Sequence, residues 1–107
     1  MKAHGEITPG ELKRRLEAGD APNLLDVREP WEFEIARIEG SKLVPMGEIS
    51  ERLSELDPES ETVVICHHGS RSAHAASALS RIGFEKVLNL EGGLDAYSDV
   101  DPSVRRY

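Results

Sequence analysis

Apolar residues fall in short runs along the chain, separated by charged stretches, and their spacing predicts strands that alternate with helices. The continuous β-branched run at 62–65 is typical of a strand buried in a parallel sheet, and the short, mainly apolar segments at 24–27 and 86–90 predict two more strands. A briefer run at 43–44, stopped by Pro45, predicts one more short strand. These runs give four expected strands.

Helical patterns occupy the intervals between these runs. A capping box with proline at the first helical position is formed by Thr8-Pro9-Gly10-Glu11. An Ala-rich segment later in the chain contains no helix breaker, and Gly83 is placed to end it. Apolar residues at helical spacing, closed by Asp57-Pro58, predict a further helix. The expected helices cover 8–18, 49–56 and 71–82, with shorter ones within 29–34 and 92–97.

Strands that alternate with helices predict an α/β fold with a mostly parallel central sheet and helices on both faces. The chain has 107 residues, a length that suits one domain with its own core. No repeat, low-complexity tract or linker divides it. We therefore expect a single domain over residues 1–107.

The composition narrows the class of protein. Apolar residues make up 38% of the chain and charged residues 31%, which is ordinary for a soluble domain. The net charge of −7 argues against nucleic acid as a partner, because phosphate-binding surfaces are usually basic. No apolar stretch approaches a membrane span or a signal peptide, so we expect no membrane partner. A single cysteine excludes an internal disulfide framework and favours a cytoplasmic location.

Cys66 stands between the expected strand 62–65 and the expected helix 71–82. Parallel α/β sheets bind ligands at the carboxyl ends of their strands. The free N–H groups of the loop and of the first helical turn favour negative charge there, so a thiol in this position should be largely thiolate. Gly69 permits a positive φ in the loop, and Arg71 offers a permanent cation with a planar fork of donors.

The pattern Cys-x-x-Gly-x-Arg-Ser that begins at Cys66 resembles the active-site loop of the rhodanese family of sulfurtransferases. Three other blocks resemble that family in the expected order, and ordered context separates a motif from a coincidence. They are the strand-turn-helix signature at 24–34, Arg37-Ile38-Glu39-Gly40-Ser41 in place of His-Ile-x-Gly-Ala, and the Gly-Gly segment at 89–97. The resemblance spans about 7–97 and implies a rhodanese-like fold.

The resemblance also implies a reaction, which is sulfur transfer by two-step covalent catalysis. The thiolate of Cys66 would take sulfane sulfur from a small anionic donor such as thiosulfate. A thiol, cyanide or a sulfur-carrier protein would then accept the sulfur from the persulfide. The loop that binds the donor and stabilises its charge would consist of His67, His68, Gly69, Ser70 and Arg71, and Arg71 would either orient the donor or rigidify the loop.

Further features refine this expectation. The family implies that Asp26 is a hydrogen-bonding support of the architecture, and Gly92-Gly93 would let the chain pass close to the Cys66 loop. The loop from Cys66 to Arg71 has six residues, whereas related phosphatases and arsenate reductases carry one more, so its length favours sulfur chemistry. The last eight residues resemble the end of rhodanese domains fused to adenylating enzymes that supply sulfur-carrier proteins.

Other interpretations of the same residues remain open. We expect no cofactor and no metal, because the adjacent Cys66, His67 and His68 seldom converge on one tetrahedral ion. The two histidines either add a pH-dependent cation near the sulfur or are solvated without effect. The alternative function is a non-catalytic or redox-sensing rhodanese-fold binding module, in which Cys66 would form a reversible sulfenate.

Overall fold

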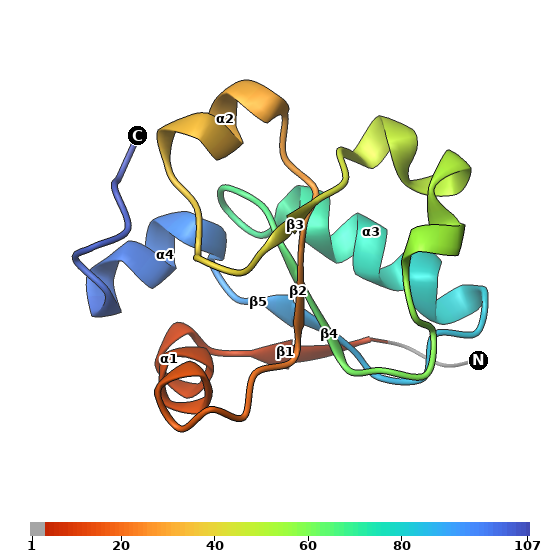
Figure 1. The fold of residues 1–107 in the computed structure, drawn as a ribbon, viewed down its shortest axis with the longest axis horizontal. Helices are drawn as coiled ribbons and strands as arrows, with labels where there is room; N and C mark the ends of the chain where they lie inside the picture. The colour runs from red at the N-terminus through yellow and green to blue at the C-terminus, as the bar shows by residue number, and fades with distance from the viewer. Residues whose placement is uncertain (1–3) are drawn as a thin grey trace.

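A computed structural model describes residues 4–107 and shows a five-stranded, entirely parallel sheet (Figure 1). The strand order is β1-β5-β4-β2-β3. The arrangement confirms the predicted α/β fold. The strands are β1 (Gly5–Ile7), β2 (Asn23–Asp26), β3 (Lys42–Leu43), β4 (Thr62–Ile65) and β5 (Val87–Leu90).

Strand β4 lies at the centre of the sheet, paired with β2 on one side and β5 on the other. All four of its side chains are buried. Val63 and Ile65 belong to the apolar cluster on one face of the sheet, whereas Val64 and the following Cys66 belong to the cluster on the other. Because alternate side chains of a strand point to opposite faces, both faces of the sheet require a cover of helices.

Helices supply that cover on both faces. Helices α1 (Pro9–Glu17) and α4 (Gly93–Val100) contribute Leu12 and Leu94 to one cluster, and α3 (Ser70–Arg81) contributes Leu79 to the other. The short helix α2 (Pro30–Ile35) follows β2. The capping box at Thr8 is present, and a left-handed Gly83 follows α3, so both predicted helix boundaries are confirmed.

The predicted helix over 49–56 is wrong in type. This segment instead forms two 3₁₀ helices, η1 (Met46–Glu51) and η2 (Leu53–Glu55), separated by Arg52 in a non-helical conformation. Residues three positions apart share a face in a 3₁₀ helix, so the spacing of Leu53 and Leu56 fits either type of helix. The sequence analysis also missed β1, in which only Ile7 is buried.

Residues 101–107, which we call the return segment, run back along the molecule after α4. Val104 is part of the same apolar cluster as α1 and α4, and Tyr107 packs against that cluster. Arg106 forms ion pairs with Asp95 and Asp99 of α4. Figure 1 shows that the return segment leads toward α2, and this path brings it to the carboxyl edge of the sheet. No helix within residues 4–107 is long and apolar enough to cross a membrane.

Candidate active site around Cys66

Cys66 follows the last residue of β4, at the carboxyl edge of the sheet, and is 1% exposed. The backbone N–H of Gly69 donates a hydrogen bond to the Cys66 Sγ atom over 3.0 Å. The Ser72 Oγ atom, in the first turn of α3, lies 3.2 Å from the same sulfur. The loop and the N-terminus of α3 therefore curl around Sγ, and the Gly69 N–H donates to it. The Ser72 hydroxyl has a single proton, which it can direct either to a thiolate at Cys66 or to the side-chain oxygen of Asn89.

The start of α4 fixes the backbone of this loop. The N–H of Leu94 donates to the Cys66 carbonyl over 2.8 Å, and the N–H of Asp95 donates to the His67 carbonyl over 3.0 Å. A Cβ atom at Gly93 would lie only 2.5 Å from the His67 carbonyl oxygen. Glycine at this position is therefore what lets α4 approach closely enough to donate these hydrogen bonds.

Arg71 does not extend into open solvent but pairs with Glu32 of α2. Its Nη1 atom lies 2.7 Å from Glu32 Oε1, and its Nη2 atom lies 2.9 Å from Oε2, so the ion pair is bidentate. The Glu32 side chain is 4% exposed and that of Arg71 is 39% exposed. Hydrogen bonds from Arg71 lower the pKa of Glu32 to about 2, against the opposing effect of burial.

This pairing bears on the two roles expected for Arg71, which are to orient an anionic donor and to rigidify the loop. Hydrogen bonds with Glu32 raise the pKa of Arg71 further above its usual range, and the charge of Cys66 adds a smaller effect of the same sign. The carboxylate of Glu32 compensates the charge of the guanidinium. The structure favours a role for Arg71 in holding the loop over a role as a free cation for an anionic donor.

The hydroxyl of Tyr107, in the return segment, reaches the same carboxylate. It accepts a hydrogen bond from Arg28 Nη1 and donates one to Glu32 Oε2, each over 2.8 Å. Burial raises the pKa of Tyr107 to about 12, so the hydroxyl keeps its proton at neutral pH. Trp31, which is 60% exposed, turns its ring edge toward the Tyr107 ring.

The two histidines of the loop form a stack with Tyr107. The His67 ring centroid lies 3.9 Å from that of His68 and 4.0 Å from that of Tyr107. Burial lowers the pKa of His67, and the neighbouring His68 lowers it further. The Nε2 atom of His67 is buried and has no hydrogen-bond partner among residues 4–107. Both effects on the pKa favour the neutral form of the His67 ring over its cation, whereas the side chains of His68 and Ser70 are exposed.

Asp26 lies behind the loop in a fully buried ion pair. Its Oδ2 atom is 2.7 Å from Arg28 Nη2, and neither side chain is exposed. Arg28 also donates to the carbonyl of Glu32 within α2 and to that of Ala36, the residue that follows the helix. The pair thus ties the end of β2 to α2, which presents Glu32 to the loop.

Sequence reasoning missed four side chains that the structure brings to this site, namely Glu32, Ser72, Asn89 and Tyr107. Asn89 of β5 accepts a hydrogen bond from the Ser72 hydroxyl and donates one to the Gly69 carbonyl. The contact of Ser72 could have been predicted from the sequence, because a serine in the first turn of a helix that begins beside a cysteine can contact the cysteine sulfur. The other three come from distant segments and leave no local signal.

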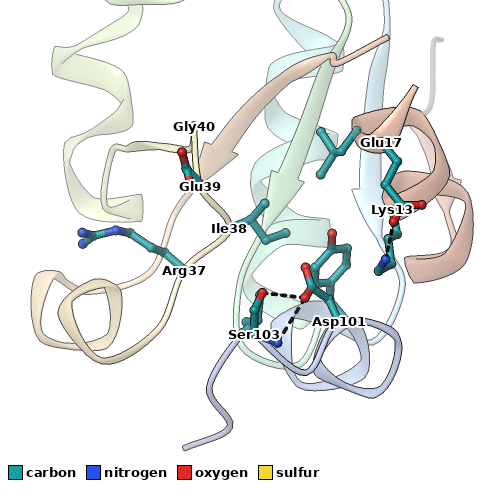
Figure 2. Close-up of a pocket in the computed structure, with 11 residues that line it drawn as sticks. Lys13, Glu17, Arg37, Ile38, Glu39, Gly40, Asp101 and Ser103 are labelled. Carbon is teal, nitrogen blue, oxygen red and sulfur yellow. Dashed lines mark hydrogen bonds and ion pairs between the residues drawn. The ribbon is translucent and has the colours of Figure 1, made fainter. Parts of the chain in front are cut away.

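A cavity of about 700 Å³ lies elsewhere, between α1, the segment 37–40 and the return segment (Figure 2). None of the site residues predicted from the sequence lines it. In this cavity Lys13 pairs with Glu17, and Asp101 accepts hydrogen bonds from Ser103. Among residues 4–107, no group of three His, Cys, Asp or Glu side chains is arranged to hold a metal ion. The candidate chemistry therefore lies at Cys66.

Comparisons with known proteins agree on the family. A scan against protein families matches the rhodanese-like domain over residues 8–99. A relative from Bacillus subtilis (strain 168) that bears the name "Putative sulfur carrier protein YrkF" is 39% identical over 89 residues, covering 83% of this chain and 48% of YrkF. Thiosulfate sulfurtransferase GlpE of Pseudomonas aeruginosa is 29% identical over 97 residues, covering 91% of this chain and 86% of GlpE.

Solved structures share the fold as well. The crystal structure of a rhodanese-related protein from Thermoplasma volcanium matches with a TM-score of 0.84 and 31% identity, covering 97% of this chain and 100% of the other. The chain spans about half of the length of YrkF, and less of some other curated relatives that it matches.

Proposed function

Because the chain belongs to the rhodanese-like domain family, we propose that it is a sulfurtransferase that carries sulfane sulfur as a persulfide on Cys66. The observation that carries this proposal is that the Gly69 N–H and the Ser72 hydroxyl both lie within hydrogen-bond distance of Cys66 Sγ, at the start of α3. Donors and a helix dipole aimed at one sulfur stabilise its thiolate, which is the nucleophilic form.

In the first step, the Cys66 thiolate attacks the outer sulfur of a donor such as thiosulfate. A sulfur–sulfur bond forms to Sγ, the sulfur–sulfur bond of the donor breaks, and sulfite leaves with that electron pair. The persulfide that remains carries a negative charge on its outer sulfur. The N–H and hydroxyl donors of the loop would stabilise this charge as an oxyanion hole stabilises a charged oxygen.

In the second step, a nucleophilic acceptor attacks the outer sulfur and Cys66 leaves as a thiolate, which completes a double displacement. The names of two relatives support the two steps of this scheme. GlpE is called a thiosulfate sulfurtransferase, which fits the donor step, and the name of YrkF includes the words sulfur carrier protein, which fits the acceptor step. The acceptor in our proposal is therefore a thiol or a sulfur-carrier protein, with cyanide as a laboratory substitute. A single free cysteine also suits a reducing, cytoplasmic setting.

Intact-mass spectrometry after incubation with thiosulfate tests this function. We expect the protein to gain one sulfur atom, to lose it when a thiol acceptor is added, and to gain none when it carries the Cys66→Ser substitution. Because Cys66 is the only cysteine, any sulfur that adds to a thiol must be on that residue. A protein that takes up no sulfur from thiosulfate or from an organic persulfide would instead support the redox-sensing or binding module.

A further inference from the structure

We propose that Tyr107 is a positioning residue of the Cys66 site, which holds the Glu32–Arg71 ion pair and the His67 ring in place beside the sulfur. Its contribution to turnover rests on the proposed sulfur transfer. Its effect on the surroundings of Cys66 does not, and can be measured separately. Tyr107 acts through other residues, because its own contacts are with Arg28, Glu32, His67 and Trp31.

The hydroxyl of Tyr107 bridges two buried charges that belong to different parts of the fold. Arg28 is held by Asp26 at the end of β2, and Glu32 is held by Arg71 at the start of α3. The Tyr107 hydroxyl accepts a hydrogen bond from Arg28 and donates one to Glu32. Without it, Arg28 Nη1 keeps only the Glu32 carbonyl, over a long 3.3 Å, and Glu32 Oε2 keeps only Arg71.

The ring of Tyr107 makes a second, independent contact with the loop. It lies flat on the His67 imidazole, with an angle of 10° between the two planes. His67 is the residue directly after Cys66, and its carbonyl accepts the N–H of Asp95. The Tyr107 ring therefore packs against the side chain of the loop residue His67, while N–H groups of α4 hydrogen-bond to the loop backbone.

These contacts make Arg71 sensitive to Tyr107. The Arg71 side chain is 39% exposed, and a long, partly exposed cation stays in one position only while its partner is fixed. Glu32 fixes it, and Tyr107 supplies one of the hydrogen bonds that orient Glu32. When the hydroxyl is absent, we expect the guanidinium to move toward solvent more often, so that the positive potential at Sγ falls.

The test compares Tyr107→Phe with Tyr97→Phe. Tyr97 is a buried tyrosine of α4 that lines the cavity described above, so the Tyr97→Phe substitution is a matched loss of one tyrosine hydroxyl outside the contacts of Cys66. The first readout is the rate of alkylation of Cys66 by anionic iodoacetate relative to neutral iodoacetamide. This ratio reports the potential at the sulfur and needs no turnover. The second readout is the KM for thiosulfate and the kcat.

In Tyr107→Phe, we expect the iodoacetate-to-iodoacetamide ratio to fall by about threefold and the KM for thiosulfate to rise by a similar factor, with kcat unchanged. Tyr97→Phe should lower the melting temperature and leave both readouts as in the wild type. A ratio in Tyr107→Phe equal to that of the wild type, or an equal change in Tyr97→Phe, would overturn the positioning role. If the wild type shows no sulfur transfer at all, the proposed function fails, and the alkylation ratio still decides the role of Tyr107.

Discussion

The ion pair between Glu32 and Arg71 should make the stability of this protein depend on pH in a defined way. Glu32 is nearly fully buried, and its carboxylate accepts hydrogen bonds from Arg71, from the Tyr107 hydroxyl and from the backbone N–H of Glu29. All of these groups favour the charged form of the carboxyl. The substitution Glu32→Gln keeps the shape of the side chain and removes its titration.

The size of the effect follows from the pKa of Glu32, which falls from its ordinary value of 4.5 to about 2 in the folded protein. That difference corresponds to about 3 kcal/mol, and because Arg71 is partly exposed to solvent we expect about 2 kcal/mol. A carboxyl whose pKa is lower in the folded state stabilises the protein above the unfolded pKa. This stabilisation is complete above about pH 4.5 and is lost as the pH falls to about 2.

The measurement is the free energy of unfolding by urea at several pH values between 6 and 3, for the wild type and for Glu32→Gln. Other carboxyl groups titrate in both proteins, so only the difference between the two curves reports Glu32. We expect this difference to shrink as the pH falls, with more than half of the effect lost by pH 3.

Glu55 provides the matched control. Hydrogen bonds from Arg52 and then Lys42 also lower its pKa to about 2, but these groups lie at the surface. Because solvent and salt screen exposed ion pairs, the curve for Glu55→Gln should run parallel to that of the wild type. If the curve for Glu32→Gln also runs parallel to the wild type, burial of the pair does not carry the pH dependence, and the reasoning fails.

Two further substitutions test the groups around the sulfur. Ser72→Ala removes a hydroxyl that can donate to Sγ, and we expect alkylation of Cys66 by iodoacetamide at pH 7 to slow by about tenfold. Ser80→Ala, a buried serine of the same helix, should leave that rate unchanged. Gly93→Ala places a Cβ against the His67 carbonyl at a positive φ, whereas Gly40→Ala meets only the backbone strain of about 1 to 2 kcal/mol. Urea unfolding should show a loss several times larger for Gly93→Ala, and equal losses would refute the close-approach argument.

The sequence predicts most of the fold because each major element has its own local signal. The strand 62–65 is a continuous β-branched run, and the capping box at Thr8 marks the start of α1. The signals fail where the burial pattern is weak or ambiguous. Strand β1 is three residues long with one buried side chain, and the spacing of residues 49–56 does not separate an α-helix from 3₁₀ turns.

The centre of the site could be predicted because Cys66 lies between a strand and a helix, and ligands bind at the carboxyl ends of the strands in a parallel sheet. The electrostatics of the site could not be predicted from the sequence. Glu32 is 39 positions from Arg71, and Tyr107 is 75 positions from Glu32, so no local pattern pairs them. A motif that contains an arginine predicts a cation, but only the structure shows whether a carboxylate already compensates it.

That compensation bears on how the sulfur would be kept reactive. With Arg71 paired to Glu32 and the pKa of His67 lowered by burial, the groups that can stabilise charge at Sγ are the Gly69 N–H, the Ser72 hydroxyl and the dipole of α3. These groups are oriented at short range, so they stabilise charge on the sulfur without giving the loop a net positive charge. The same donors can serve the thiolate and the persulfide, whereas a free arginine would also retain the sulfite that must leave. Pairing Arg71 with Glu32 therefore fits a site that must both accept and release an anion in each cycle.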